Sequence, residues 1–268
     1  MSATARDVKP ILFRNGAFQA GDRRVPEETA IAISVNGSTH AVMMATPDHV
    51  EELALGLALN ERIVASIAEI ERFDIEESDL GLDARLWLNA ARAATYVARR
   101  RQMTGPVGCG LCGVESLELA QRELPLVAAQ ASVAPETIVA AVNAMSAQQS
   151  LGRQTRAVHA AAFHDGQGAH VVTREDVGRH NALDKVAGHL ARAGVDPSRG
   201  ILTITSRVSV ELIQKAAVMG TGLIAAVSAP TALAIRSAEG AGITLVAVAR
   251  GEEFEIFTHP ARVEGAVA

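Results

Sequence analysis

The stretch that decides the fold runs from Ile201 to Val248 and reads ILTITSRVSVELIQKAAVMGTGLIAAVSAPTALAIRSAEGAGITLVAV. Short apolar runs at residues 201–205, 223–227 and 243–248 have the length and composition of buried strands. Helical periodicity fills the two intervals between them, at residues 208–219 and 231–239. Strands that alternate with helices predict an α/β fold, with a mixed, largely parallel sheet flanked by helices. Residues 254–257 are expected to add an antiparallel edge strand.

The N-terminal part of the chain shows a different pattern. Apolar runs at residues 31–35 and 41–44 flank Asn36-Gly37, a pair that favours a hairpin turn because both residues tolerate positive φ. We expect a helix at 47–60, with Pro47 as its first helical residue, and a strand pair that fills 73–97. The Ala and Arg content of residues 90–101 leaves strand and helix hard to separate there.

The pattern as a whole divides the chain into three parts. We expect a smaller N-terminal α+β region at 1–104, a mobile cysteine loop at 105–113, and an α/β core at 114–268 that carries a ligand-binding crevice. Two further helices are predicted before the core strands, at 114–124 and 135–150.

Composition narrows the function classes. The chain is 49% hydrophobic but only 3% aromatic, so aliphatic side chains must fill its core. A formal net charge of -5 argues against a nucleic-acid partner. No apolar run is long enough to span a membrane, and the first residues lack the pattern of a secretory signal. We therefore expect a cytoplasmic protein without a membrane partner.

Both cysteines of the chain, Cys109 and Cys112, lie in the glycine-rich segment 105–113. In a reducing compartment a C-x-x-C pair is typical of dithiol redox exchange, of half a zinc site, or of sulfur carriage as a persulfide. Zinc would need histidine ligands, because no other cysteine exists. Two incidental thiols are the remaining alternative. Four glycines favour a loop that moves between partners over the rigid strand-to-helix placement of a thioredoxin motif.

A dense polar stretch, REDVGRHN at residues 174–181, opens a predicted helix at 182–190. Arg179 beside Gly178 and a helix N-terminus can bind an anion. The same stretch can instead form a buried capping and ion-pair network that orders a junction between the two halves. Spacing alone does not separate these interpretations.

Polar residues also follow each predicted parallel strand. In such sheets the loops beyond the carboxyl ends of the strands form the ligand crevice, which here suits a nucleotide. Ordinary helix caps are the structural alternative, since no dinucleotide or P-loop glycine motif is present. His159, on another apolar strand, is expected to be a core histidine rather than a ligand, with a position that faces the site as the alternative. The strand-end residues are Ser206, Arg207, Ser228, Ala229, Pro230, Thr231, Ala249, Arg250, Gly251 and Glu252.

An ordered set of motifs resembles the formate dehydrogenase accessory sulfurtransferase family (FdhD/NarQ). The resemblance spans nearly the whole chain. Its longest matches are CGLCG at 109–113, VHAAAF at 158–163, REDVGRHNALDK at 174–185 and SAPT at 228–231. Shorter ones are VNG at 35–37, TPD at 46–48, SRVSVE at 206–211, QKAA at 214–217 and THP at 258–260.

The resemblance implies a sulfurtransferase with Cys109 and Cys112 as catalytic residues. Cys109 matches the cysteine that carries the persulfide, and Cys112 matches its neighbour. Sulfur would come from a cysteine desulfurase and go to the molybdenum cofactor, in its bis(molybdopterin guanine dinucleotide) form, which is bound as substrate for a formate dehydrogenase client. No resident metal or permanent cofactor is expected. The family's nucleotide-binding stretch maps onto Val248, Ala249, Arg250, Gly251, Glu252 and Glu253.

The resemblance also implies a cytidine-deaminase-like core and a homodimer. It does not imply deaminase activity, because that chemistry needs a glutamate two residues after the histidine, and Ala161 follows His159 there. The chain departs from the family's pattern at Thr155-Arg156-Ala157, where a glycine pair is common. The alternatives to sulfur transfer are a dithiol oxidoreductase and a non-catalytic chaperone that shelters the cofactor.

Overall fold

The computed structural model describes residues 3–100, 124–128 and 132–266. The predicted cysteine loop at 105–113 and nearly all of the predicted helix at 114–124 lie outside these ranges. None of the described helices is both long and apolar enough to span a bilayer.

A six-stranded mixed sheet forms the centre of the larger half, in the order β10-β9-β11-β12-β13-β14. The predicted alternation of strands and helices is confirmed, because α7 and α8 connect three strands that run parallel. The remaining three pairings are antiparallel, so the expectation of a largely parallel sheet is wrong for the sheet as a whole. Short turns join β9 to β10 and β13 to β14. Two neighbouring strands joined by a short turn must run antiparallel, which explains these two pairings. The strands and connecting helices are β9 (His159–Asp165), β10 (His170–Asp176), β11 (Gly200–Ile204), α7 (Val210–Met219), β12 (Leu223–Ala226), α8 (Ala232–Ala241), β13 (Thr244–Arg250) and β14 (Glu253–Ile256).

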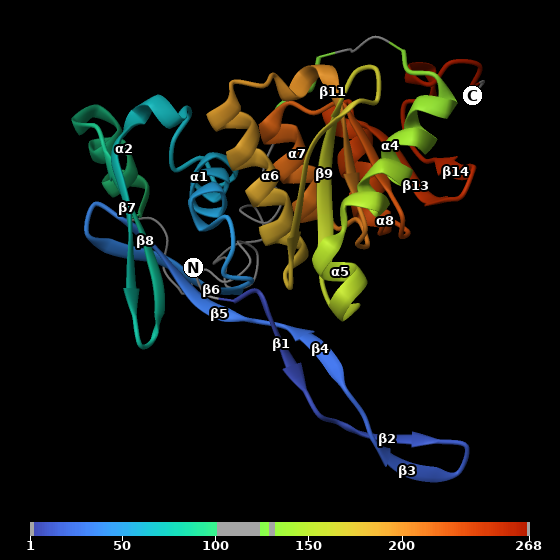
Figure 1. The fold of residues 1–268 in the computed structure, drawn as a ribbon. Coiled ribbons are helices and arrows are strands. Elements are labelled where there is room, and N and C mark those ends of the chain that lie inside the picture. Colours follow the sequence, from blue (N-terminus) through green and yellow to red (C-terminus); the bar gives the residue numbers. More distant parts are fainter. Residues whose placement is uncertain (1–2, 101–123, 129–131, 267–268) are drawn as a thin grey trace.

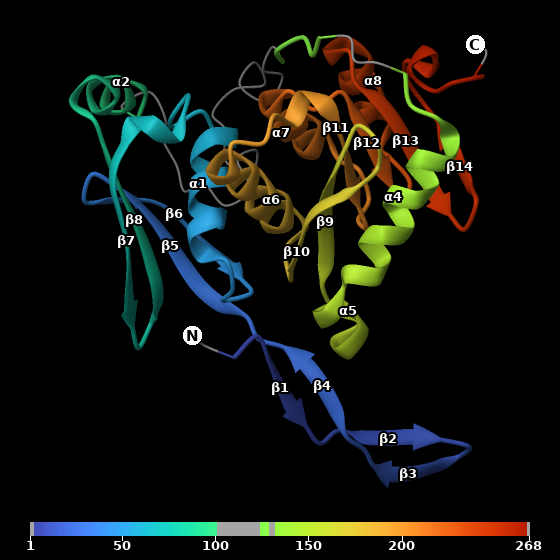
Figure 2. The ribbon, with the colours of Figure 1, turned by 45° about the horizontal axis from the view of Figure 1, so that its top comes forward.

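Helices cover both faces of this sheet (Figures 1 and 2). Alternate strand residues point to opposite faces: Leu202 packs with α6 (Arg179–Ala193) and α7, whereas Ile201 packs with α4 (Pro135–Gln148). The helix predicted at 135–150 is confirmed as α4, and the short α5 (Ser150–Thr155) follows it. The central strands are buried on both sides, which explains their uninterrupted apolar sequences.

The smaller half contains a four-stranded sheet with the order β6-β5-β8-β7. The predicted hairpin is confirmed: Asn36 and Gly37 have φ of 49° and 76° between β5 (Thr29–Val35) and β6 (Ser38–Ala45). The predicted strand pair is β7 (Ile70–Ser78) and β8 (Gly81–Leu88), but it stops at Leu88. Residues 90–100 form the helix α2 (Ala90–Arg100), as their alanine and arginine content allows.

The helix predicted at 47–60 begins three residues later than expected. It is α1 (Val50–Asn60), preceded by His49 with a left-handed φ of 52°. A left-handed residue cannot continue a right-handed helix backward, so Pro47 is not its first helical residue. The buried side of α1 packs on the four-stranded sheet and forms a core whose residues all come from positions 31–96.

The first strands form an arm that extends away from the body (Figure 1). It consists of β1 (Ala5–Val8) paired with β4 (Arg23–Pro26), and of the hairpin β2 (Ile11–Arg14) with β3 (Ala17–Ala20) at its far end. Ile11, Phe13 and Phe18 are exposed on this hairpin. The homodimer expected from the family resemblance stays a prediction, and sedimentation of the chain with and without this arm would check it.

The two halves meet where α1 crosses α6 (Figures 1 and 2). A Cβ atom on Gly56 of α1 would lie 1.8 Å from the carbonyl oxygen of Asp184, and one on Gly188 of α6 would lie 1.9 Å from that of Glu52. Each helix therefore presents a glycine to the other's backbone. Only residues without a side chain permit such a close approach of two helices.

We predict that Gly188→Ala destabilises the protein although alanine favours helices. The added methyl group must push the two helices apart, and overpacking of this kind costs ~1–3 kcal/mol. Chemical denaturation measures the change in the free energy of unfolding. Gly240→Ala is the matched control, because Gly240 lies in α8 with open space around its Cα. That control is expected to stabilise by up to ~1 kcal/mol. Equal effects of the two substitutions would contradict the crossing.

Candidate functional site

Of the two parts of the predicted site, the strand-end residues lie within the described ranges and the cysteine pair does not. Cys109 and Cys112 lie outside the described residues. The residues after the parallel strands are described throughout. They lie together, because the carboxyl ends of parallel strands meet at one edge of a sheet.

Backbone hydrogen bonds join the connections at this edge. The Val208 amide after β11 donates to Ala229 O after β12 at 3.3 Å, and the Thr231 amide donates back to Val208 O at 3.0 Å. The Val248 amide of β13 donates to Ser228 O at 3.4 Å. The loops that carry the predicted nucleotide-binding residues thus form one connected surface.

Individual residues of this edge differ in what they do. Thr231 caps α8, since its Oγ1 accepts a hydrogen bond from the Ala234 amide at 3.2 Å, and the cap interpretation holds for it. The Ser206 hydroxyl donates to Arg207 O at 3.2 Å. Arg207 and Arg250 are exposed, so both cations can reach an anion in solvent.

The end of β13 has an irregular backbone. Pairing with β14 shifts register between Ala247 and Arg250, and Val248 has a φ of 55°. A β-branched residue rarely takes this left-handed conformation. Gly251 follows in the turn with a φ of 62°, where glycine fits without strain. Ala249, Glu252 and Glu253 complete the stretch that the family resemblance assigns to the nucleotide.

The polar motif at 174–185 divides between two roles. Its buried members form the junction network. Lys185 and Asp176 are both fully buried and form an ion pair with Nζ 2.6 Å from Oδ2. Lys185 Nζ also donates to Thr46 O at 3.0 Å, and the Thr46 amide donates to Asp176 Oδ2 at 3.1 Å. Asn181 Nδ2 donates to Asp176 Oδ1 and to Met44 O, both at 3.0 Å.

A second ion pair links the halves beside the first. Arg174 donates from Nε and Nη2 to the two carboxylate oxygens of Glu52, and His189 Nδ1 lies 3.0 Å from Glu52 Oε1. Burial alone would raise the pKa of Glu52, but hydrogen bonds from Arg174 and His189 outweigh it and lower the pKa. For these residues the junction interpretation of the motif is confirmed.

Arg179 and His180 take no part in the junction network and lie in the first turn of α6. Arg179 Nε and His180 Nδ1 are buried, and neither has a hydrogen-bond partner among the described residues. Burial, together with the positive charge of Arg179, lowers the pKa of His180 to about 4, so its imidazole is neutral at pH 7. These two residues are the part of the motif that remains available for binding.

Two residues of α7 join Arg179 and His180. Ser209 precedes the helix and Glu211 lies in its first turn. Ser209 Oγ and Glu211 Oε2 are also buried, and within the described part of the chain neither has a hydrogen-bond partner. Burial alone would raise the pKa of Glu211, but the Ser209 hydroxyl, which lies close without forming a hydrogen bond of normal geometry, lowers it together with a backbone amide, His180 and Arg179. Sequence reasoning missed Ser209 and Glu211 as site residues, although both belong to the quoted SRVSVE motif.

His159 also lies at this edge, because it begins β9, which runs antiparallel to β11. Its side chain is only partly buried, so the expectation of a core histidine is wrong. Burial and the charge of Arg179 lower its pKa. Thr155-Arg156-Ala157, where the chain departs from the family's pattern, lies just before His159 in the sequence. Arg156 has a φ of 55°, a left-handed backbone conformation that favours glycine.

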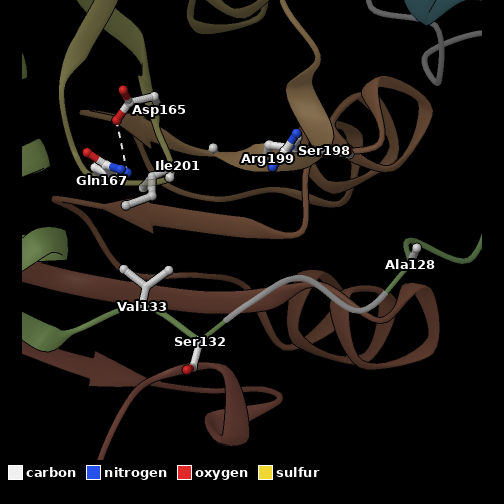
Figure 3. A pocket seen from close by; sticks show the side chains of 10 residues that line it. Ala128, Ser132, Val133, Asp165, Gln167, Ser198, Arg199 and Ile201 are labelled. Carbon is white, nitrogen blue, oxygen red and sulfur yellow. Dashed lines mark hydrogen bonds between the residues drawn. The ribbon is translucent and has the colours of Figure 1, made fainter.

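A separate cavity of about 710 Å³ opens at the opposite end of the sheet, where β11 begins (Figure 3). Asp165 is the carboxylate in its lining, and it accepts hydrogen bonds from the amides of Gln167 and Ala169, both at 2.9 Å. Its carboxylate therefore stabilises its own turn, and among the described residues that line the cavity none is a predicted site residue.

Comparisons with known proteins by family profile, by sequence and by structure agree with one another. The profile of the FdhD/NarQ family matches residues 26–264. The chain is 49% identical over 264 residues to the sulfur carrier protein FdhD of Agrobacterium fabrum, covering 98% of this chain and 97% of the relative. It is 50% identical over 261 residues to the protein of the same name from Brucella abortus, covering 97% of each.

A crystal structure of a formate dehydrogenase accessory protein from Desulfotalea psychrophila has the same fold. The TM-score is 0.76 at 24% sequence identity, and the match covers 97% of this chain and 100% of the other. The mixed α/β architecture is thereby confirmed. The likeness to cytidine deaminases stays a prediction.

We predict that Lys185→Met strongly destabilises the protein. The substitution leaves Asp176 as a buried charge without its cation, and breaking a buried ion pair in this way costs about 3–5 kcal/mol. Denaturant unfolding measures the loss. Lys9→Met is the control, because Lys9 is exposed and is expected to change stability by less than ~0.5 kcal/mol. A Lys185 variant as stable as the control would show that the junction does not depend on this pair.

Proposed function

Because the chain belongs to the FdhD/NarQ family, we propose that it carries sulfur for the maturation of a molybdenum-dependent formate dehydrogenase. The observation that supports this most directly is the similarity to sulfur carrier proteins along 98% of the chain. The structural relative from Desulfotalea psychrophila is described as an accessory protein of formate dehydrogenase. We propose the same client for this chain.

The sulfur step that we propose takes place on Cys109. Its thiolate attacks the outer sulfur of a persulfide on a cysteine desulfurase. A new S–S bond forms at Cys109 while the S–S bond on the desulfurase breaks, and the desulfurase cysteine leaves as a thiolate. Cys112, three residues away, is proposed to assist the later transfer or release. The protein thus acts as a sulfurtransferase.

The acceptor that we propose is the molybdenum cofactor with two guanine dinucleotide groups. The connected loops at the edge of the sheet support this, since they offer the exposed cations Arg207 and Arg250 together with the helix N-terminus that follows Thr231. These are groups that bind phosphates. A nucleotide held at this edge positions the metal end of the cofactor with binding energy from a part of the ligand that does not react.

We predict that incubation with a cysteine desulfurase and cysteine adds one sulfur atom to Cys109. Mass spectrometry of the intact protein and of its peptides measures the added mass. Cys109→Ala should lose the modification completely, and Cys112→Ala should keep it. An intramolecular disulfide without persulfide would support a dithiol oxidoreductase instead. A Cys109→Ala protein that still restores formate dehydrogenase activity would support a chaperone.

We predict separately that Arg250→Ala weakens the binding of GDP. Losing a charged hydrogen bond of about 1.5 kcal/mol lowers the affinity roughly tenfold. Isothermal titration calorimetry measures the dissociation constant. Arg236→Ala is the matched control, because Arg236 is an exposed arginine in the middle of α8. Unchanged GDP affinity in Arg250→Ala would remove Arg250 from the nucleotide site without affecting the persulfide prediction.

A further inference from the structure

Unsatisfied polar atoms are concentrated at one place in the fold. Among the described residues, eight buried side-chain polar atoms lack a hydrogen-bond partner, and four of them belong to Arg179, His180, Ser209 and Glu211. Buried polar groups are nearly always paired, because an unpaired one costs about 1–3 kcal/mol. Ser209 is only 7% exposed, so bulk water reaches it poorly. Such a concentration indicates a ligand with complementary groups.

The four residues lie on two neighbouring helices. Arg179 and His180 belong to the first turn of α6, and Ser209 and Glu211 to the start of α7, which packs against α6. Their charges act on one another: Arg179 and Glu211 both affect the titration of His180, and Arg179 affects that of Glu211. They therefore form one cluster, at the edge where β11 ends.

The chemistry of the cluster is mixed rather than purely cationic. Arg179 only donates hydrogen bonds, the carboxylate of Glu211 only accepts them, and Ser209 can do either. A bare phosphate would satisfy Arg179 but would face the negative charge of Glu211. The complement to this set is a ring with adjacent N–H donors for the carboxylate and a carbonyl oxygen for the guanidinium.

We propose that this cluster recognises a 2-amino-4-oxopyrimidine ring. Glu211 accepts hydrogen bonds from the ring N–H and the 2-amino group, and Arg179 donates to the carbonyl oxygen. Guanine and pterin both present this ring. The inference rests on the proposed function, whose cofactor contains both heterocycles, and it assigns their recognition to residues outside the loop at 248–253.

The experiment uses ligand pairs that differ in the 2-amino group. Calorimetry compares GDP with IDP, which lacks that group, and pterin with lumazine, which has oxygen in its place. The wild-type chain is expected to bind at least one amino-bearing ligand about 10- to 100-fold more tightly than its partner. In Glu211→Gln this preference should fall to about twofold or less, because an amide cannot accept two hydrogen bonds from adjacent donors as the carboxylate does.

Two variants keep the result interpretable. Glu136→Gln is the matched control, since Glu136 lies in the first turn of α4 as Glu211 does in α7, but is exposed. It should keep the wild-type preference. Ser209→Ala tests the cluster with a smaller change and should weaken the preferred ligand about threefold or more. Thermal melts of each variant verify that it is folded.

The outcome also identifies the ring. Loss of the GDP preference assigns guanine to the cluster, and loss of the pterin preference assigns pterin; either result supports the inference. A folded Glu211→Gln protein that keeps both preferences overturns it, as does a wild-type chain with no preference in either pair. Because persulfide formation on Cys109 is measured independently, failure here is distinguishable from failure of the proposed function.

Discussion

The close crossing of α1 and α6 holds the six-stranded and the four-stranded sheet together, and the position of the candidate site depends on it. Gly56 and Gly188 allow the backbones to touch, but side-chain packing between helices is compatible with more than one crossing angle. The direction comes from the buried network at the start of both helices, where Thr46, Asp176 and Lys185 bind one another. Steric fit and directional hydrogen bonds thus act on different turns of the same pair of helices.

The polar motif at 174–185 contains residues that form the junction and residues that remain available for binding. Positions 181, 184, 185 and 188 follow the 3–4 residue spacing of one helical face, and this face meets the smaller half. Asp184 extends the link to a third helix, because it binds Asn60 of α1 and Lys215 of α7. Burial raises the pKa of Asp184, and the Lys215 charge opposes that effect. The junction therefore fixes α7 relative to α6, and with it the spacing between Glu211 and Arg179.

Local patterns in the sequence were sufficient for most of the architecture. The Asn36-Gly37 turn and the alternation at 201–248 depend on neighbouring residues, and both were predictable. The burial of Lys185 was not, because its partner Thr46 lies 139 positions away and only the folded chain brings them together. The strand-end residues were predictable as a group from the parallel order. Ser209 and Glu211 were not, because at the start of a helix such residues usually serve as caps, and only the unsatisfied atoms distinguish them. The surroundings of the two cysteines lie outside the described residues.

Several residues have a left-handed backbone conformation that no sequence pattern predicts. His49, Arg156 and Val248 have positive φ without being glycine or asparagine. They lie before α1, before β9 and at the end of β13, and so flank the elements that carry the junction and the site. A left-handed residue of this kind costs roughly 1–2 kcal/mol and persists only where its surroundings determine it. Loops held in this way lose little conformational freedom when a ligand binds, so less binding free energy is lost to ordering them.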